Sequence, residues 1–80
     1  MDRKAGLTPR QLEVLRWIVG YQRRTGFMPT IREIGLAFGM ASTNGPRWFL
    51  HVLASRGMLK RTPGRARTIR LTEAGQAAAA

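Results

Sequence analysis

Apolar residues recur every three or four positions along residues 9–24, which is the spacing of one face of an α-helix. The repeating positions are Leu12, Leu15, Ile18 and Val19, with Val14, Trp17 and Tyr21 widening the apolar face. Thr8 and Gln11 have the spacing of a capping box, and Pro9 suits a first helical turn. The pattern therefore predicts a helix over residues 9–24.

A second start signal follows at Thr30, because Glu33 repeats the capping-box spacing. The apolar residues behind it again have helical spacing: Ile31, Ile34, Ala37 and Phe38. They predict a short helix over residues 31–38. Gly39 comes next, where a left-handed residue permits a sharp change of direction. A third helix after this turn would complete a helix-turn-helix.

The third helix is expected to begin between Ser42 and Asn44, either of which can act as its N-cap. Gly45 and Pro46 would damage a helix interior, but a first turn tolerates proline because its amides have no intrahelical partner. Beyond them, an apolar stripe faces the core: Phe49, Leu50, Leu53 and Ala54. The other face of the helix consists of Asn44, Arg47, Trp48, His51, Val52 and Ser55.

After Gly57 the period changes from helical to alternating, which predicts two β-strands. They lie within “MLKRT” and “RTIRL”, and Pro63-Gly64 between them fits the centre of a tight turn. The expected fold is mainly α with a small antiparallel β-hairpin, a winged helix-turn-helix of three helices plus a wing. We expect this domain over residues 7–71, after a flexible arm at residues 1–6.

Residues 72–80, “TEAGQAAAA”, are expected to be a tail or a short helical turn. Alanine favours helix intrinsically, so one turn could begin at Thr72. The same alanines offer little to hold such a turn against the domain. We therefore place this end of the chain outside the winged helix-turn-helix.

Charge is the strongest compositional signal, because fourteen Lys and Arg residues against four Asp and Glu give a formal charge of +10. This excess is larger than the magnitude of roughly 2–8 that solubility needs. It favours a polyanionic partner, of which nucleic acid is the commonest, although an anionic membrane or an acidic protein would also fit.

The predicted wing carries five of these cations: Lys60, Arg61, Arg65, Arg67 and Arg70. Edge strands often carry charge to prevent aggregation. That explanation does not require every charge to be positive, whereas contact with phosphates or with a narrow minor groove does. We therefore assign the wing residues to the DNA backbone or minor groove.

Few residues suggest catalysis, a cofactor or a metal. The chain has no cysteine and one histidine, His51, without a neighbouring cysteine or acidic residue. The four carboxylates are scattered along the sequence, so we expect no enzyme activity, cofactor or metal. No apolar run approaches the roughly 20 residues of a membrane span, and the N-terminus lacks a secretory signal. A cytoplasmic protein without a membrane partner is expected.

Several short motifs stand in register with one family: “LTPRQLEVLRWI”, “TGFMPTIREIGLAFGM”, “STN…LHVLASRGML” and “RTIRL”. Over residues 7–71 the chain resembles the N-terminal winged helix-turn-helix of LexA-type repressors. The resemblance implies a bacterial or phage-encoded, nucleoid-associated regulator whose third helix lies in the major groove of double-stranded DNA. The residues expected to read bases are Ser42, Asn44, Gly45, Arg47, Trp48 and His51. Thr30 is expected to join the wing residues at the DNA backbone.

The chain departs from that family in two respects. LexA-type repressors carry a peptidase domain that dimerises and cleaves its own linker, and these 80 residues contain no such domain, so we expect neither activity here. “GPRW”, residues 45–48, stands where the family commonly has alanines followed by an acidic pair. A different operator is therefore expected, with Arg47 on guanine and Asn44 on adenine.

The main alternative is a protein-interaction module, such as a phage or host factor whose winged helix binds a regulator or RNA polymerase. Trp48 and Val52 lie one turn apart on the outer face, and an exposed tryptophan is a common binding anchor. Trp48 could instead pack against Met40 or the turn, and binding of structured RNA is a third reading. Because one small domain buries little surface on DNA, we also expect a homodimer, adjacent half-sites or a protein partner.

Overall fold

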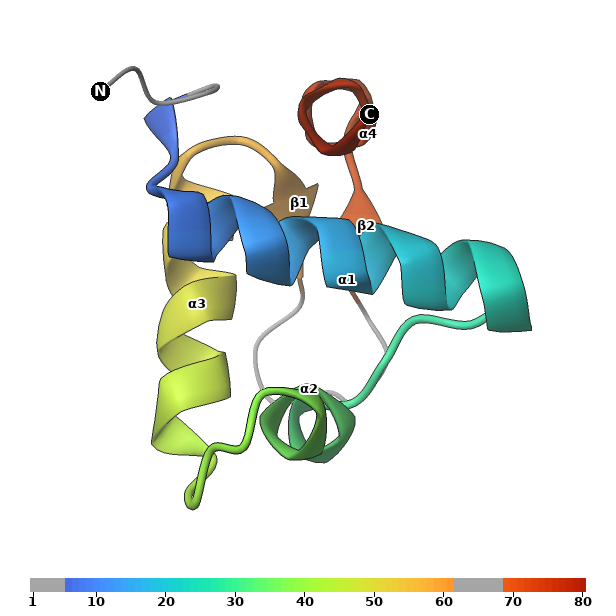
Figure 1. Ribbon diagram of the computed structural model, residues 1–80. Coiled ribbons are helices and arrows are strands. Elements are labelled where there is room, and N and C mark those ends of the chain that lie inside the picture. The colour runs from blue at the N-terminus through green and yellow to red at the C-terminus, as the bar shows by residue number, and fades with distance from the viewer. Residues whose placement is uncertain (1–5, 62–68) are drawn as a thin grey trace.

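The computed structural model describes residues 6–61 and 69–80. Within these ranges, four helices and a two-stranded hairpin follow one another along the chain (Figure 1). Their bounds are α1 Pro9–Thr25, α2 Ile31–Ala37, α3 Asn44–Ser55, β1 Leu59–Lys60, β2 Arg70–Leu71 and α4 Glu73–Ala79. The prediction of a mainly helical fold with a small antiparallel hairpin is confirmed, with one helix more than expected.

Helices α1 and α2 begin as their capping boxes predict. The Thr8 hydroxyl accepts a hydrogen bond from the Gln11 backbone N–H at 3.2 Å, and the Gln11 side chain accepts one from the Thr8 N–H at 2.9 Å. At α2 the same pair of bonds joins Thr30 and Glu33, at 3.1 and 2.8 Å. Backbone donors that would lack a partner at a helix start are thereby satisfied, which fixes where both helices begin.

The Glu33 carboxylate also ties α2 to α1. Its Oε2 atom accepts a hydrogen bond of 2.6 Å from the Tyr21 hydroxyl of α1, while its Oε1 atom accepts the Thr30 N–H. Hydrogen bonds to an ionised acceptor are stronger than neutral ones. One side chain therefore sets both the start of α2 and its place beside α1.

The hydrophobic core joins α1, α2, α3 and the base of the hairpin. Its fully buried side chains include Leu7, Val14, Leu15, Ile18, Ile34, Leu50, Leu53 and Leu59. Trp17 packs against this core, with its ring centroid 5.3 Å from that of Tyr21 and 5.8 Å from that of Phe38. The aromatic residues of α1 thus serve packing, as their spacing predicts.

Gly39 makes the turn after α2. Its φ of 67° is left-handed, a conformation that glycine adopts without steric cost. The Met40 N–H then donates a hydrogen bond of 2.8 Å to the Gly35 carbonyl, which closes the turn. The predicted change of direction at Gly39 is confirmed.

The hairpin pairs β1 and β2 antiparallel, with Leu59 opposite Leu71 and Lys60 opposite Arg70. Leu59 and Ile69 are buried and Leu71 is half-buried, so the apolar residues of the hairpin face the core. Each strand is two residues long, within the longer segments that the alternation predicts. The Pro63-Gly64 turn lies outside the described residues, as does all of the expected arm except Gly6.

Helix α4 is an addition to the expected architecture, and it packs on α1 (Figure 1). Thr72 caps it by accepting the Gly75 N–H at 3.0 Å and itself donates a hydrogen bond of 2.6 Å to the Gly57 carbonyl. Ala78 is buried, and Gly75 lies so close to Met58 that an added Cβ would overlap the Met58 carbonyl. The expectation of weak anchoring is wrong because small residues let the helix backbone approach this closely.

Gly75→Ala is expected to destabilise the protein by about 1–3 kcal/mol, since backbone must move to accommodate the methyl group. Gly20→Ala is the matched control, because nothing lies within 4 Å of a Cβ added at that position in α1. There the higher helix propensity of alanine should stabilise the protein by about 0.5–1 kcal/mol. Urea unfolding followed by circular dichroism measures both changes, and equal stabilities would contradict the close packing of α4.

Candidate nucleic-acid interface

The outer face of α3 forms one continuous stripe of side chains. The stripe consists of four exposed residues, Asn44, Arg47, Trp48 and His51, and the exposed Ser55 lies beyond it at the end of the helix. Counted from the first, the four stand at positions i, i+3, i+4 and i+7, which lie on the same side of a helix. Leu50 and Leu53, on the opposite side, are fully buried. Val52 beside the stripe is half-buried, and Ser42 is exposed just before the helix.

Helix α3 begins at Asn44, within the predicted range, but its N-cap differs from the prediction. Thr43 is the N-cap, with helical backbone angles of φ −80° and ψ −7°, and its side chain makes no capping hydrogen bond. The Ser42 hydroxyl accepts the Asn44 backbone N–H at 3.3 Å instead. The prediction that Ser42 or Asn44 caps α3 is therefore wrong, because the chain already has helical angles at Thr43. As a consequence, Asn44 is the first residue of the helix and its side chain is exposed.

Packing against α2 holds the first turn of α3. Pro46 is fully buried, and a Cβ added to Gly35 of α2 would come 3.3 Å from the Pro46 Cγ atom. A Cβ added to Gly45 would come 2.8 Å from the Met40 sulfur. Helices α2 and α3 therefore approach each other closely at Gly35. The missing side chain of Gly45 faces Met40, and the role of Gly45 in base reading stays a prediction.

Trp48 is the aromatic residue of the stripe, and 54% of its surface is exposed. Its ring meets that of Phe49 edge-on, with centroids 5.0 Å apart and planes at 78°. Phe49 in turn packs against the core. Packing against Met40 or the turn therefore does not cover the indole, and its orientation is set from one side by Phe49.

Lys60 and Arg70 are direct cross-strand partners in the hairpin. Both are exposed, and directly paired residues point to the same face of a sheet. Like charges in this position repel, so an anion bound beside them would remove an unfavourable interaction. Of the other wing residues, Arg61 is half-buried, whereas Arg65 and Arg67 lie outside the described residues.

The start of α2 adds a further cation. Thr30 is half-buried, and its hydroxyl caps the helix by accepting the Glu33 N–H. Arg32 is exposed two residues later and is not among the contact residues predicted from the sequence. An arginine two residues after a predicted cap, in the first turn of the first helix of a helix-turn-helix, is the signal that would have identified it. Phosphate contacts commonly come from such cations.

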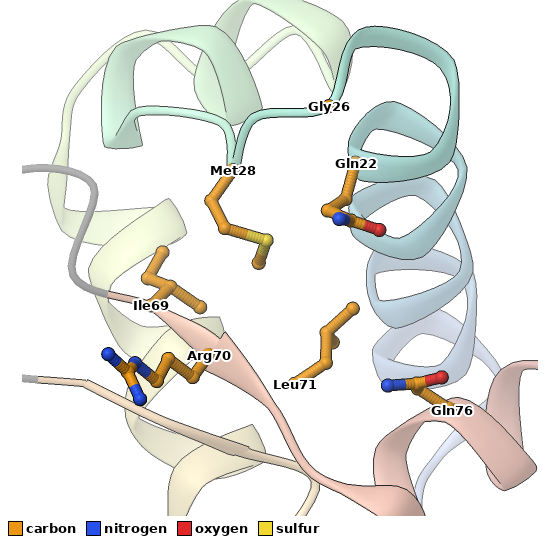
Figure 2. Close-up of a pocket in the computed structure, with 7 residues that line it drawn as sticks. All are labelled: Gln22, Gly26, Met28, Ile69, Arg70, Leu71 and Gln76. Carbon is orange, nitrogen blue, oxygen red and sulfur yellow. The ribbon is translucent and has the colours of Figure 1, made fainter.

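A pocket of about 340 Å³ lies away from α3, between α1, the segment before α2, β2 and α4 (Figure 2). It is lined by Gln22, Gly26, Met28, Ile69, Arg70, Leu71 and Gln76. Figure 2 shows Met28, Ile69 and Leu71 pointing into the pocket, while the Arg70 guanidinium points away from it. The pocket therefore leaves Arg70 available at the outer face of the hairpin.

Over residues 6–61 and 69–80, no group of three or more His, Cys, Asp or Glu side chains could hold a metal ion. In the same ranges, no helix has both the length and the apolar character needed to cross a membrane. The α3 stripe and the paired cations of the hairpin remain the main candidate contact surfaces.

A family model described as the LexA DNA binding domain matches residues 4–68. The LexA repressor of Anaeromyxobacter dehalogenans strain 2CP-1 is 47% identical over 73 residues, which are 91% of this chain and 32% of that protein. The LexA repressor of Ralstonia pickettii strain 12J is 45% identical over 74 residues, 92% of this chain and 34% of that protein. The chain thus spans about a third of the length of these curated relatives.

The match agrees with the architecture. It begins before α1 and contains the whole helix-turn-helix of α2 and α3. The resemblance inferred from the short motifs is thereby confirmed over most of the chain. This chain belongs to the LexA DNA-binding domain family.

Proposed function

We propose that the chain binds double-stranded DNA at specific sequences and regulates transcription, with α3 in the major groove and the hairpin on the backbone or in the minor groove. The observation that carries the proposal is the exposed stripe on α3, whose first turn is held by packing against α2. A helix of this kind fits the major groove of B-DNA. Relatives named as repressors support repression as the form of regulation.

Asn44 and Arg47 supply the hydrogen bonds for base recognition. A guanidinium group can donate two hydrogen bonds to O6 and N7 of guanine, and a carboxamide can both donate to and accept from adenine. The two residues stand three positions apart on one side of α3, so both reach the same groove. Ser42, Gly45, Trp48 and His51 complete the proposed base-reading set.

Lys60 and Arg70 anchor the hairpin to phosphates, and Thr30 and Arg61 are proposed to contribute to the backbone contacts. Their charges displace counterions from DNA, which raises affinity for every sequence equally. The proposed roles of Arg65 and Arg67 follow from the sequence of the wing alone. We assign no enzymatic step to the chain.

The number of chains on the operator follows from the size of the domain. A single module of this kind buries less surface than large specific complexes do, so we propose that two chains, or one chain and a partner, occupy adjacent half-sites. The family match does not favour the protein-interaction module as the main function. A protein that binds DNA would lie with the nucleoid in the bacterial cytoplasm.

Arg47→Ala is expected to cost about 1–3 kcal/mol on the preferred site and to relax the preference at one base pair. The site is first selected from a random DNA pool, and affinities are then measured by fluorescence anisotropy. Arg23→Ala removes an equal charge from the last turn of α1, at the end of that helix away from α3, and should keep the preference (Figure 1). An equal loss on every DNA sequence would instead make Arg47 a phosphate anchor.

Replacing both Lys60 and Arg70 by alanine is expected to weaken binding to all sequences alike. The slope of log K against log salt should fall by about one unit per lost phosphate contact, or about two in total. The free protein should be no less stable, because the substitution removes a repulsion between neighbours. A salt slope equal to that of the unaltered chain would refute the backbone role, and Arg23→Ala with Arg24→Ala is the control for net charge.

A further inference from the structure

Three large apolar side chains are exposed in the described residues: Phe27 at 67%, Leu36 at 77% and Trp48 at 54%. Trp48 alone belongs to the stripe on α3, where it directly follows Arg47 and stands three residues before His51. An indole presents a large apolar surface, and leaving such a surface in water forgoes the free energy of its burial. Its position among the base-reading residues indicates a partner in the groove.

The ring is also oriented before any partner binds. The edge-on contact with Phe49, whose own side chain packs against the core, restricts the rotation of the indole. A side chain that is already ordered loses little conformational entropy on binding. Trp48 is therefore suited to a specific contact with a small apolar group.

The major groove offers one such group. Each base pair presents hydrogen-bond donors and acceptors there, and thymine alone among the four standard bases adds an apolar C5-methyl group. We propose that Trp48 reads the methyl group of a thymine close to the base contacted by Arg47. The inference rests on the proposed function, because it requires α3 to lie in the major groove.

The proposal makes Trp48 a specificity-determining residue of this chain. Guanidinium and carboxamide groups distinguish bases by their hydrogen bonds, whereas the indole would distinguish thymine from cytosine by one methyl group. The operator should then combine a guanine contacted by Arg47 with a thymine contacted by Trp48. Carboxylates such as those common in the family accept hydrogen bonds from cytosine, whereas Arg47 donates them to guanine.

Substitution of deoxyuridine for thymine tests the proposal, because the two bases differ only in the methyl group. The preferred site of the 80-residue chain is selected from a random DNA pool, and its thymines are replaced one at a time. At the contacted position of each half-site, the replacement should weaken binding about fourfold, as loss of one buried methyl-sized group predicts. Trp48→Ala should bind the thymine and uracil sites with equal affinity.

Two variants control the experiment. Trp48→Gln keeps a long side chain with good helix propensity and should lose the same discrimination, which guards against an effect of lost helix stability. Phe27→Ala removes an exposed aromatic ring outside the stripe and should keep the discrimination in full. Thermal unfolding of each variant shows whether the fold is retained.

The outcomes distinguish a failure of the thymine contact from a failure of the proposed function. The chain could prefer a DNA site whose affinity is unchanged when any thymine is replaced by deoxyuridine, or Trp48→Ala and Trp48→Gln could keep the discrimination. In either case the thymine contact is wrong while DNA recognition stands. If Trp48→Ala binds DNA as the unaltered chain does but no longer binds a protein partner, the thymine contact is likewise wrong. Failure to select any preferred sequence would overturn the proposed function and this inference together.

Discussion

The contact between Gly35 of α2 and Pro46 of α3 determines where the outer face of α3 points. A Cβ added at Gly35 would come 3.3 Å from the Pro46 ring, so the backbone of α2 lies close to that ring. A rigid ring against a residue without a side chain leaves little freedom in the angle between the helices. Asn44 and Arg47 belong to the same first turn as Pro46, so the angle between the helices also sets where these two residues lie.

Other restraints connect this contact to the rest of the domain. The Glu33 carboxylate joins the start of α2 to Tyr21 of α1, and the left-handed Gly39 directs the chain from α2 towards α3. Met40 then fills the space beside Gly45. The residues proposed to read bases are therefore carried on a framework that is ordered before DNA arrives, which lowers the cost of binding.

Local signals in the sequence predict most of this framework, because capping boxes and a left-handed glycine act within a few residues. The cap of α3 escapes prediction, since the backbone at Thr43 is already helical and no side-chain signal marks it. The packing of helix α4 escapes it too, because its anchor is the missing side chain of Gly75 against the distant Met58 carbonyl. Helical periodicity predicts which side chains of α3 are exposed, but the bases that they contact depend on a partner outside the sequence.

The hydrogen bonds of Thr72 have a geometric consequence for the hairpin. Thr72 follows β2 directly and bonds to the Gly57 and Met58 carbonyls, which link α3 to β1. These bonds tie the base of the hairpin to the segment after α3, which limits how far the hairpin can move relative to that helix. On DNA, a restricted separation favours sites whose groove width already matches it, since other sequences would have to deform. Sequence would then be read partly through the shape of base pairs that no side chain touches.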